Sequence, residues 1–114
     1  MSNLNNLELA TLERVAIKNP SIAQHIPYLK VKERKLTGVG MFVKFEYSDK
    51  VGIINNIEPT NVSLGTRDPI KMTNLKYGLG FEVDISNGRV NYIEFVTYGE
   101  EWDGSIIEFH FANS

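Results

Sequence analysis

Apolar and polar residues along positions 79–98 alternate in a pattern that predicts a β-hairpin. Two runs rich in β-branched and aromatic residues flank Asn87-Gly88. This dipeptide favours a two-residue type I′ turn, because both turn positions need a positive φ, which Asn and Gly tolerate best. The hairpin indicates an antiparallel sheet, and by itself it indicates no function.

Helical spacing marks the N-terminal segment. Apolar residues recur at this spacing over residues 4–16, and Asn5 followed by Glu8 resembles a capping box. Asn19-Pro20 ends this helix, because the residue before a proline avoids the helical region. The same pair can begin a second short helix, which we expect to run to about Ile26.

Period-two alternation and β-branched residues predict further strands after the helices. We expect them at residues 28–37, 41–47, 62–64 and 106–111, with a helical turn over residues 70–75. Helices come first and strands follow, without regular βαβ alternation. The order predicts an α+β fold in which N-terminal helices pack on an antiparallel β-sheet of about five or six strands.

Length and composition are those of one ordinary globular domain spanning residues 1–114. The chain is 42% hydrophobic and 23% charged, and it has no cysteine, which excludes disulfides and thiolate chemistry. We read no signal peptide in residues 1–6 and no apolar run long enough to span a bilayer. These features favour a cytoplasmic location and no membrane association.

Charge is distributed unevenly along the chain. The net charge of −2 makes nucleic acid an unlikely partner. Residues 1–50 hold eight Lys/Arg and five Asp/Glu, whereas residues 51–114 hold four and nine. This asymmetry indicates either a surface for another protein or two halves of the fold that pair with each other.

Glu94 is the first candidate for a functional residue. A simple Asn87-Gly88 hairpin pairs Val83 with Tyr92, and it places Glu94 on an otherwise apolar face. A buried carboxylate needs a partner, so Glu94 is either a tuned carboxylate in a pocket or half of a salt bridge, for example to Arg34 or Lys32. A β-bulge that turns Glu94 to solvent is a further alternative.

The segment after the hairpin is the best candidate for a recognition loop. It joins two aromatic residues to three acids between glycines, and its candidate binding residues are Tyr98, Glu100, Glu101, Trp102 and Asp103. Tyrosine and tryptophan are common interface anchors. The alternative is structural, with Trp102 sealing the edge of the core and the acids solvated.

Catalytic and metal-binding signatures are missing from the sequence. His25 and His110 are isolated and have no ligand spacing, so we assign no metal site, no catalytic residue and no cofactor. The basic stretch from Lys30 to Lys35 suits either phosphates or, more simply, the charged face of an edge strand. The protein is more readily understood as a non-enzyme.

Several short segments follow one another between residues 35 and 104. They are the TGVGFF-like segment Lys35-Leu36-Thr37-Gly38-Val39-Gly40-Met41-Phe42-Val43, and then Gly78-Leu79-Gly80-Phe81, Asn87-Gly88-Arg89-Val90, Ile93-Glu94, Thr97-Tyr98-Gly99 and Trp102. In this order they resemble the segments of a family of small uncharacterised bacterial proteins. The resemblance implies a bacterial α+β domain. It brings no activity, and it adds weight to a special role for Glu94 and Tyr98.

These observations lead to two expectations about function. The first is a small non-enzymatic protein-interaction module of the immunity or accessory kind, with another protein as partner; a homodimer is also compatible with the sequence. The alternative is a small-ligand-binding protein or enzyme with a cleft near Tyr92, Glu94 and Tyr98. An exposed apolar and acidic patch would favour the first, and a deep apolar pocket the second.

Overall fold

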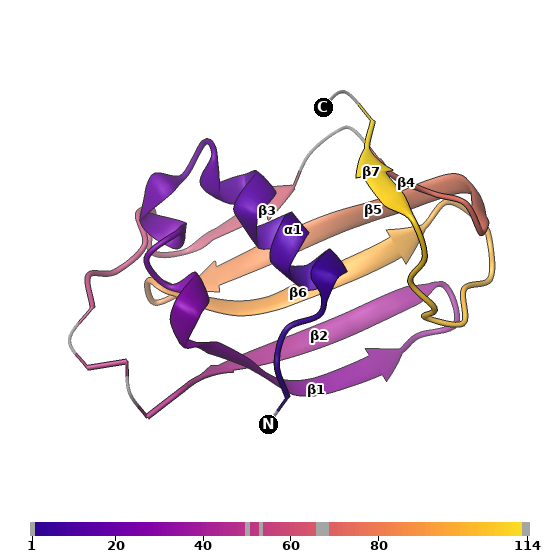
Figure 1. Ribbon diagram of the computed structural model, residues 1–114. Helices are drawn as coiled ribbons and strands as arrows, with labels where there is room; N and C mark the ends of the chain where they lie inside the picture. The colour runs from indigo at the N-terminus through magenta and orange to yellow at the C-terminus, as the bar shows by residue number, and fades with distance from the viewer. Residues whose placement is uncertain (1, 50, 53, 66–68, 113–114) are drawn as a thin grey trace.

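The computed structural model describes residues 2–49, 51–52, 54–65 and 69–112, and it confirms the α+β class (Figure 1). The described residues form α1 (Asn6–Ala16), the 3₁₀ helices η1 (Pro20–Ile22) and η2 (Ile26–Tyr28), and the strands β1 (Leu29–Leu36), β2 (Gly40–Tyr47), β3 (Val62–Gly65), β4 (Ile70–Met72), β5 (Leu75–Ser86), β6 (Arg89–Thr97) and β7 (Phe109–Phe111).

One antiparallel sheet contains all of these strands, in the order β1-β2-β6-β5-β4-β7, with β3 paired to β5 as well. The described residues thus form seven strands, more than the expected five or six. The helical turn expected over residues 70–75 is wrong. Ile70 and Met72 are buried on either side of exposed Lys71, which is strand periodicity, and β4 pairs with both β5 and β7.

The N-terminal helix begins as its sequence predicts. The Asn5 backbone N–H donates to Glu8 Oε1 (2.9 Å) and the Glu8 N–H donates to Asn5 Oδ1 (2.8 Å), which completes the capping box. The second helix expected up to Ile26 is instead two separate 3₁₀ turns, because Pro20 and Pro27 each start a turn and limit the helix between them.

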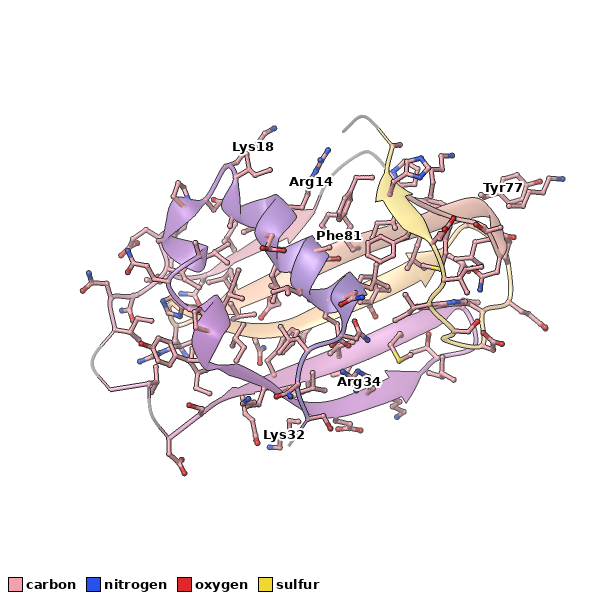
Figure 2. The ribbon with its side chains drawn as sticks, in the orientation of Figure 1. Arg14, Lys18, Lys32, Arg34, Tyr77 and Phe81 are labelled. Atoms are coloured by element: carbon pink, nitrogen blue, oxygen red, sulfur yellow. The ribbon has the colours of Figure 1, made fainter. Side chains whose placement is uncertain are left out.

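The hydrophobic core lies between α1 and one face of the sheet. Figure 2 shows Phe81 of β5 on this face, and Val83 and Ile85 follow it at alternate, buried positions. Helix α1 contributes Leu7, Leu12 and Val15 from its inner side. Figure 1 shows α1 and both 3₁₀ helices on the same side of the sheet, and no described helix crosses the opposite side.

An ion pair joins α1 to β1 at one edge of this core. Arg34 Nε and Nη2 donate to the two carboxylate oxygens of Glu8, at 2.7 and 2.9 Å, and the Glu8 side chain is only 1% exposed. The hydrogen bond from Arg34 to Glu8 raises the pKa of Arg34 above its ordinary value. Arg34 is therefore engaged by Glu8, and the expected salt bridge from Arg34 to Glu94 is wrong.

A buried histidine holds the other end of the molecule together. His25 Nε2 lies 2.7 Å from the Asn55 carbonyl, which can only accept, so Nε2 carries the hydrogen and Nδ1 accepts from the Tyr47 hydroxyl at 2.8 Å. The Tyr47 oxygen in turn accepts the Val90 N–H at 2.8 Å. Burial is the main cause that lowers the pKa of His25, and the charge of Arg89 adds to it.

The turn of the β5–β6 hairpin is a two-residue turn, as the sequence predicts. Asn87 and Gly88 both have positive φ, 52° and 74°. Gly88 also ties the turn to the preceding loop, because its carbonyl accepts the Ile57 N–H and its own N–H donates to the Thr60 carbonyl. Within the described residues, no helix is long and apolar enough to cross a membrane.

Candidate functional site

A β-bulge in β6 decides which side chains reach the uncovered side of the sheet. Ser86 pairs with Arg89 and Ile85 with Val90, as expected, but the next pair is Asp84 with Tyr92. Asn91 is the extra residue, and beyond it every β6 side chain changes face. The predicted register past Val90 and the position of Glu94 on the apolar face are therefore wrong.

Because of this change of face, two apolar residues of β6 beyond Asn91 move to the core side of the sheet and two polar residues move to the opposite side. Ile93 and Phe95 join the buried core, at 0% and 1% exposure, whereas Tyr92 and Glu94 are half-buried on the opposite side. This uncovered side is called the open face below. Its centre consists of Phe42 and Lys44 of β2, Tyr92 and Glu94 of β6, and Glu82 and Asp84 of β5.

Two carboxylates face each other across the open face. Glu82 and Glu94 are directly opposed residues of β5 and β6, and like charges at such positions destabilise a sheet. Ser63 of β3 donates a short hydrogen bond to Glu82. Within the described part of the chain, no basic side chain forms an ion pair with either carboxylate.

An aromatic pair lies beside these carboxylates. Phe42 is the neighbour of Glu94 on β2, and its ring centroid is 4.8 Å from that of Tyr92. Burial, followed by the charges of Asp84, Glu82 and Glu94, raises the pKa of the Tyr92 phenol. The open face thus joins apolar rings to a concentrated negative charge.

Asp84 and Asn91 anchor the polar end of this face. Asp84 Oδ2 accepts from Ser86 Oγ (2.6 Å) and from Asn91 Nδ2 (2.9 Å), and Lys44 donates a short hydrogen bond to Asn91 Oδ1. The bulge residue therefore links β2, β5 and β6 through its own amide. This network satisfies Asp84.

Tyr98 extends the open face beyond the end of β6. Its hydroxyl lies 2.8 Å from where a Cβ on Gly80 would stand, so the tyrosine side chain lies across β5 at a position that only glycine leaves open. Tyr98 is 51% exposed and Val96, also on this face, is 42% exposed. Three residues of the predicted cleft, Tyr92, Glu94 and Tyr98, therefore share one surface.

Two other residues of the predicted recognition loop, Trp102 and Glu100, make contacts that stabilise the fold. Trp102 is 6% exposed, its indole meets Phe95 edge-on, and Nε1 donates to the Ser105 carbonyl at 3.0 Å. The Glu100 carboxylate accepts the backbone N–H groups of Lys76 and Tyr77, both at 2.8 Å. These contacts match the structural alternative for Trp102.

Asp103 and Glu101 occupy the outer part of this loop. Asp103 Oδ1 accepts from the Ser105 hydroxyl (2.6 Å) and backbone N–H (2.9 Å), and these bonds lower the pKa of Asp103. Glu101 is exposed. Both border a hollow of about 570 Å³, so the loop keeps an accessible acidic rim.

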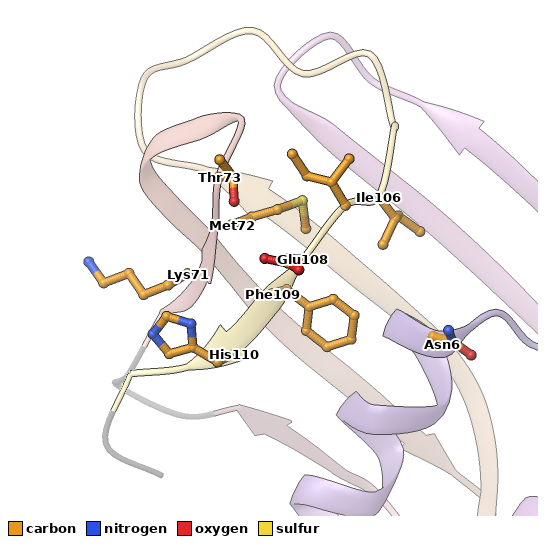
Figure 3. Close-up of a pocket in the computed structure, with 9 residues that line it drawn as sticks. Asn6, Lys71, Met72, Thr73, Ile106, Glu108, Phe109 and His110 are labelled. Atoms are coloured by element: carbon orange, nitrogen blue, oxygen red, sulfur yellow. The ribbon is translucent and has the colours of Figure 1, made fainter.

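Another hollow, with a volume of about 800 Å³, lies elsewhere on the described surface. Figure 3 shows its lining side chains on β4, on β7 and the segment before it, and at the start of α1. Lys71, Glu108 and His110 are its charged or titratable residues. Among the described residues, no three His, Asp or Glu side chains are placed to hold a metal ion.

Sequence reasoning missed Phe42 and the pairing of Glu82 with Glu94. A signal for Phe42 existed, because it is an apolar residue at a polar position of the alternating run from Met41 to Tyr47. The pairing depends on the bulge at Asn91, which the sequence offered only as one alternative for Glu94. No family model, curated protein or solved structure matches the chain. The resemblance of residues 35–104 to a bacterial family therefore stays a prediction.

Proposed function

We propose that this protein is a small non-enzymatic interaction module whose open face binds a basic surface of another protein. The observation that carries the proposal is the pairing of Glu82 with Glu94. Two opposed carboxylates weaken the sheet that presents them, by about 0.2–1 kcal/mol. A cationic partner would neutralise both at once, so the arrangement that costs stability in the free protein favours the complex.

Charge complementarity supports a basic partner. On the β1–β2 half of the face, Lys30 opposes Glu46 and Glu33 opposes Lys44, so opposite charges meet. At the centre of the β5–β6 half, the charged residues Glu82, Asp84 and Glu94 are all acidic, whereas the basic residues of these strands lie at their ends, where Arg89 stacks on Tyr47 and Lys76 on Tyr77. Arginine or lysine side chains of a partner fit this half and would be steered to it by its potential.

The aromatic residues supply the apolar part of the proposed interface. Phe42 and Tyr92 form a half-buried pair at its centre, and Tyr98 lies exposed near its margin. Aromatic side chains surrounded by polar groups are common energetic centres of interfaces, and a guanidinium group also stacks favourably on their rings. Glu101 and Asp103 would lie at the rim and contribute to the rate of association.

Neutralising or escorting a basic protein is the role that this surface supports best. The functional class is that of an immunity or accessory protein, which acts by occupying its partner. Such a role needs shape and charge and no catalytic group, which agrees with the way the open face is built.

Chemical-shift mapping tests the proposal. An arginine-rich amphipathic peptide is titrated into ¹⁵N-labelled protein at low salt, and its charge-reversed counterpart serves as the control. We expect the amides of Phe42, Tyr92 and Glu94 to shift, with an affinity that falls as salt is added. Shifts confined to the α1 side, or shifts on dilution of the protein alone that reveal a homodimer through this face, would contradict the proposal.

A further inference from the structure

A second site lies on the covered side of the sheet, away from the open face. A cavity of about 140 Å³ separates the start of α1 from β1, β2, β6 and residues 102–106. Its walls include Leu7, Met41, Phe95, Trp102, Ile106 and the Glu8–Arg34 ion pair. We infer that this cavity binds one small neutral aromatic molecule that carries an oxygen acceptor.

The size and the apolar walls of the cavity define the body of the ligand. An engineered apolar cavity of about 150 Å³ stays dry and binds benzene, so a single aromatic ring is the largest group of this kind that fits here. Phe95 and Trp102 meet edge-on at 6.5 Å between ring centroids, and both line the space. A third ring can add further edge or face contacts.

The ion pair at the wall defines the polar part of the ligand. Glu8 Oε1 accepts from Asn5 and from Arg34 Nη2, and Oε2 accepts from Arg34 Nε, so the carboxylate is satisfied. Arg34 Nη2 also donates to the Asn3 carbonyl at 3.1 Å. These bonds use Nε and Nη2 of the Arg34 side chain, which is 32% exposed, so Nη1 can donate to a ligand oxygen.

Charge balance excludes an ionised ligand. Glu8 is 1% exposed and already neutralised by Arg34, so a carboxylate or an ammonium group would introduce an uncompensated charge beside this buried carboxylate. An alcohol or a carbonyl group instead gains a hydrogen bond from a charged donor at no such cost. The inference does not depend on the function proposed for the open face.

Trp102 makes the site directly measurable, because it is the only tryptophan in the chain and it lines the cavity. Benzyl alcohol and toluene have the same ring and differ in the oxygen. We expect both to change the tryptophan emission saturably, and benzyl alcohol to bind roughly tenfold more tightly, as one hydrogen bond to a charged donor predicts. Arg34→Lys should keep the ion pair with Glu8 and bring the two affinities close together.

A pair of methionine variants locates the binding. Met41→Phe narrows the cavity, whereas Met72→Phe makes the same change in the larger hollow between β4 and β7. We expect Met41→Phe to abolish the saturable change and Met72→Phe to preserve it. No saturable change with the folded parent protein, equal affinities for the two probes, or loss only in Met72→Phe would overturn the inference. The parent titrations decide the matter even if a variant fails to fold.

Discussion

At the scale of single residues, Glu94 and Glu8 show how the same residue type can serve surface or core. Glu94 is half-buried on the open face opposite another carboxylate, while Glu8 is fully buried against Arg34. Trp102 belongs to the core although its neighbours Glu101 and Asp103 are exposed. The role of each residue follows from the partners that the sheet places beside it.

At position 88, both the backbone conformation and the packing require glycine. Its φ is 74°, and a Cβ there would stand 2.4 Å from the Asn56 side chain. Gly88→Val should lower the free energy of unfolding by about 1–3 kcal/mol, measured as the urea midpoint. Gly99→Val is the matched control, because Gly99 also has a positive φ (83°) but has nothing within 4 Å. Equal losses in both variants would show that the contact with Asn56 has no effect.

Trp102→Ala should destabilise the protein strongly. Removal of a buried tryptophan that packs on Phe95 leaves a large void, and the expected cost is about 3–5 kcal/mol. Thermal melting measures the effect, and Glu101→Ala in the same loop should leave the midpoint nearly unchanged. A Trp102→Ala protein that melts with the parent would instead support Trp102 as an interface anchor.

At the scale of elements, the bulge in β6 is the feature that the simple alternating pattern does not place, although a bulge that turns Glu94 away from the core was one alternative from the sequence, and the structure confirms it. The turn at Asn87-Gly88, the capping box of α1 and the strands near residues 41–47 and 62–64 are local, and local residue types predict them. The extra residue at Asn91 is instead set by tertiary packing, because it allows Ile93 and Phe95 to be buried in the core. The apolar pair Ile93 and Phe95 was the available signal, since the simple register left both on the polar side.

Deletion of Asn91 tests this explanation. Without the extra residue, Glu94 would face the core while Ile93 and Phe95 would face solvent, so we expect loss of cooperative folding. Circular dichroism and thermal melting measure the result. Asn91→Ala keeps the residue count and removes only the bonds to Asp84 and Lys44, and it should cost about 1 kcal/mol. A stably folded deletion protein would contradict the account of the register.

At the scale of the whole molecule, the sheet separates two kinds of surface. One side carries α1, the core and the Glu8–Arg34 pair, and the other carries the acids and rings of the open face. His25 connects the 3₁₀ region to β2 and the start of β6 through Tyr47 and Val90. Protonation of this one buried ring therefore acts on the stability of the whole fold.

Stability should decrease in mild acid because of His25. Burial lowers its pKa below the ordinary 6.5, so between the two values the unfolded chain binds a proton that the folded protein does not. The contribution is complete above about pH 6.5 and is lost as the pH falls toward the folded pKa. Urea unfolding of the parent and of His25→Gln at several pH values measures it. The same pH slope for both proteins would exclude His25 as the cause.

The measurement that tests the central claim most directly compares stability and affinity in one variant, Glu94→Gln. The account predicts that the free energy of unfolding rises by about 0.2–1 kcal/mol, because the repulsion with Glu82 is removed. It also predicts that the affinity for the arginine-rich peptide falls about tenfold, equivalent to about 1.4 kcal/mol, while Glu13→Gln on the exposed surface of α1 leaves both quantities unchanged. A Glu94→Gln protein that is less stable than the parent and binds the peptide equally well would contradict the claim that the open face is built for a basic partner.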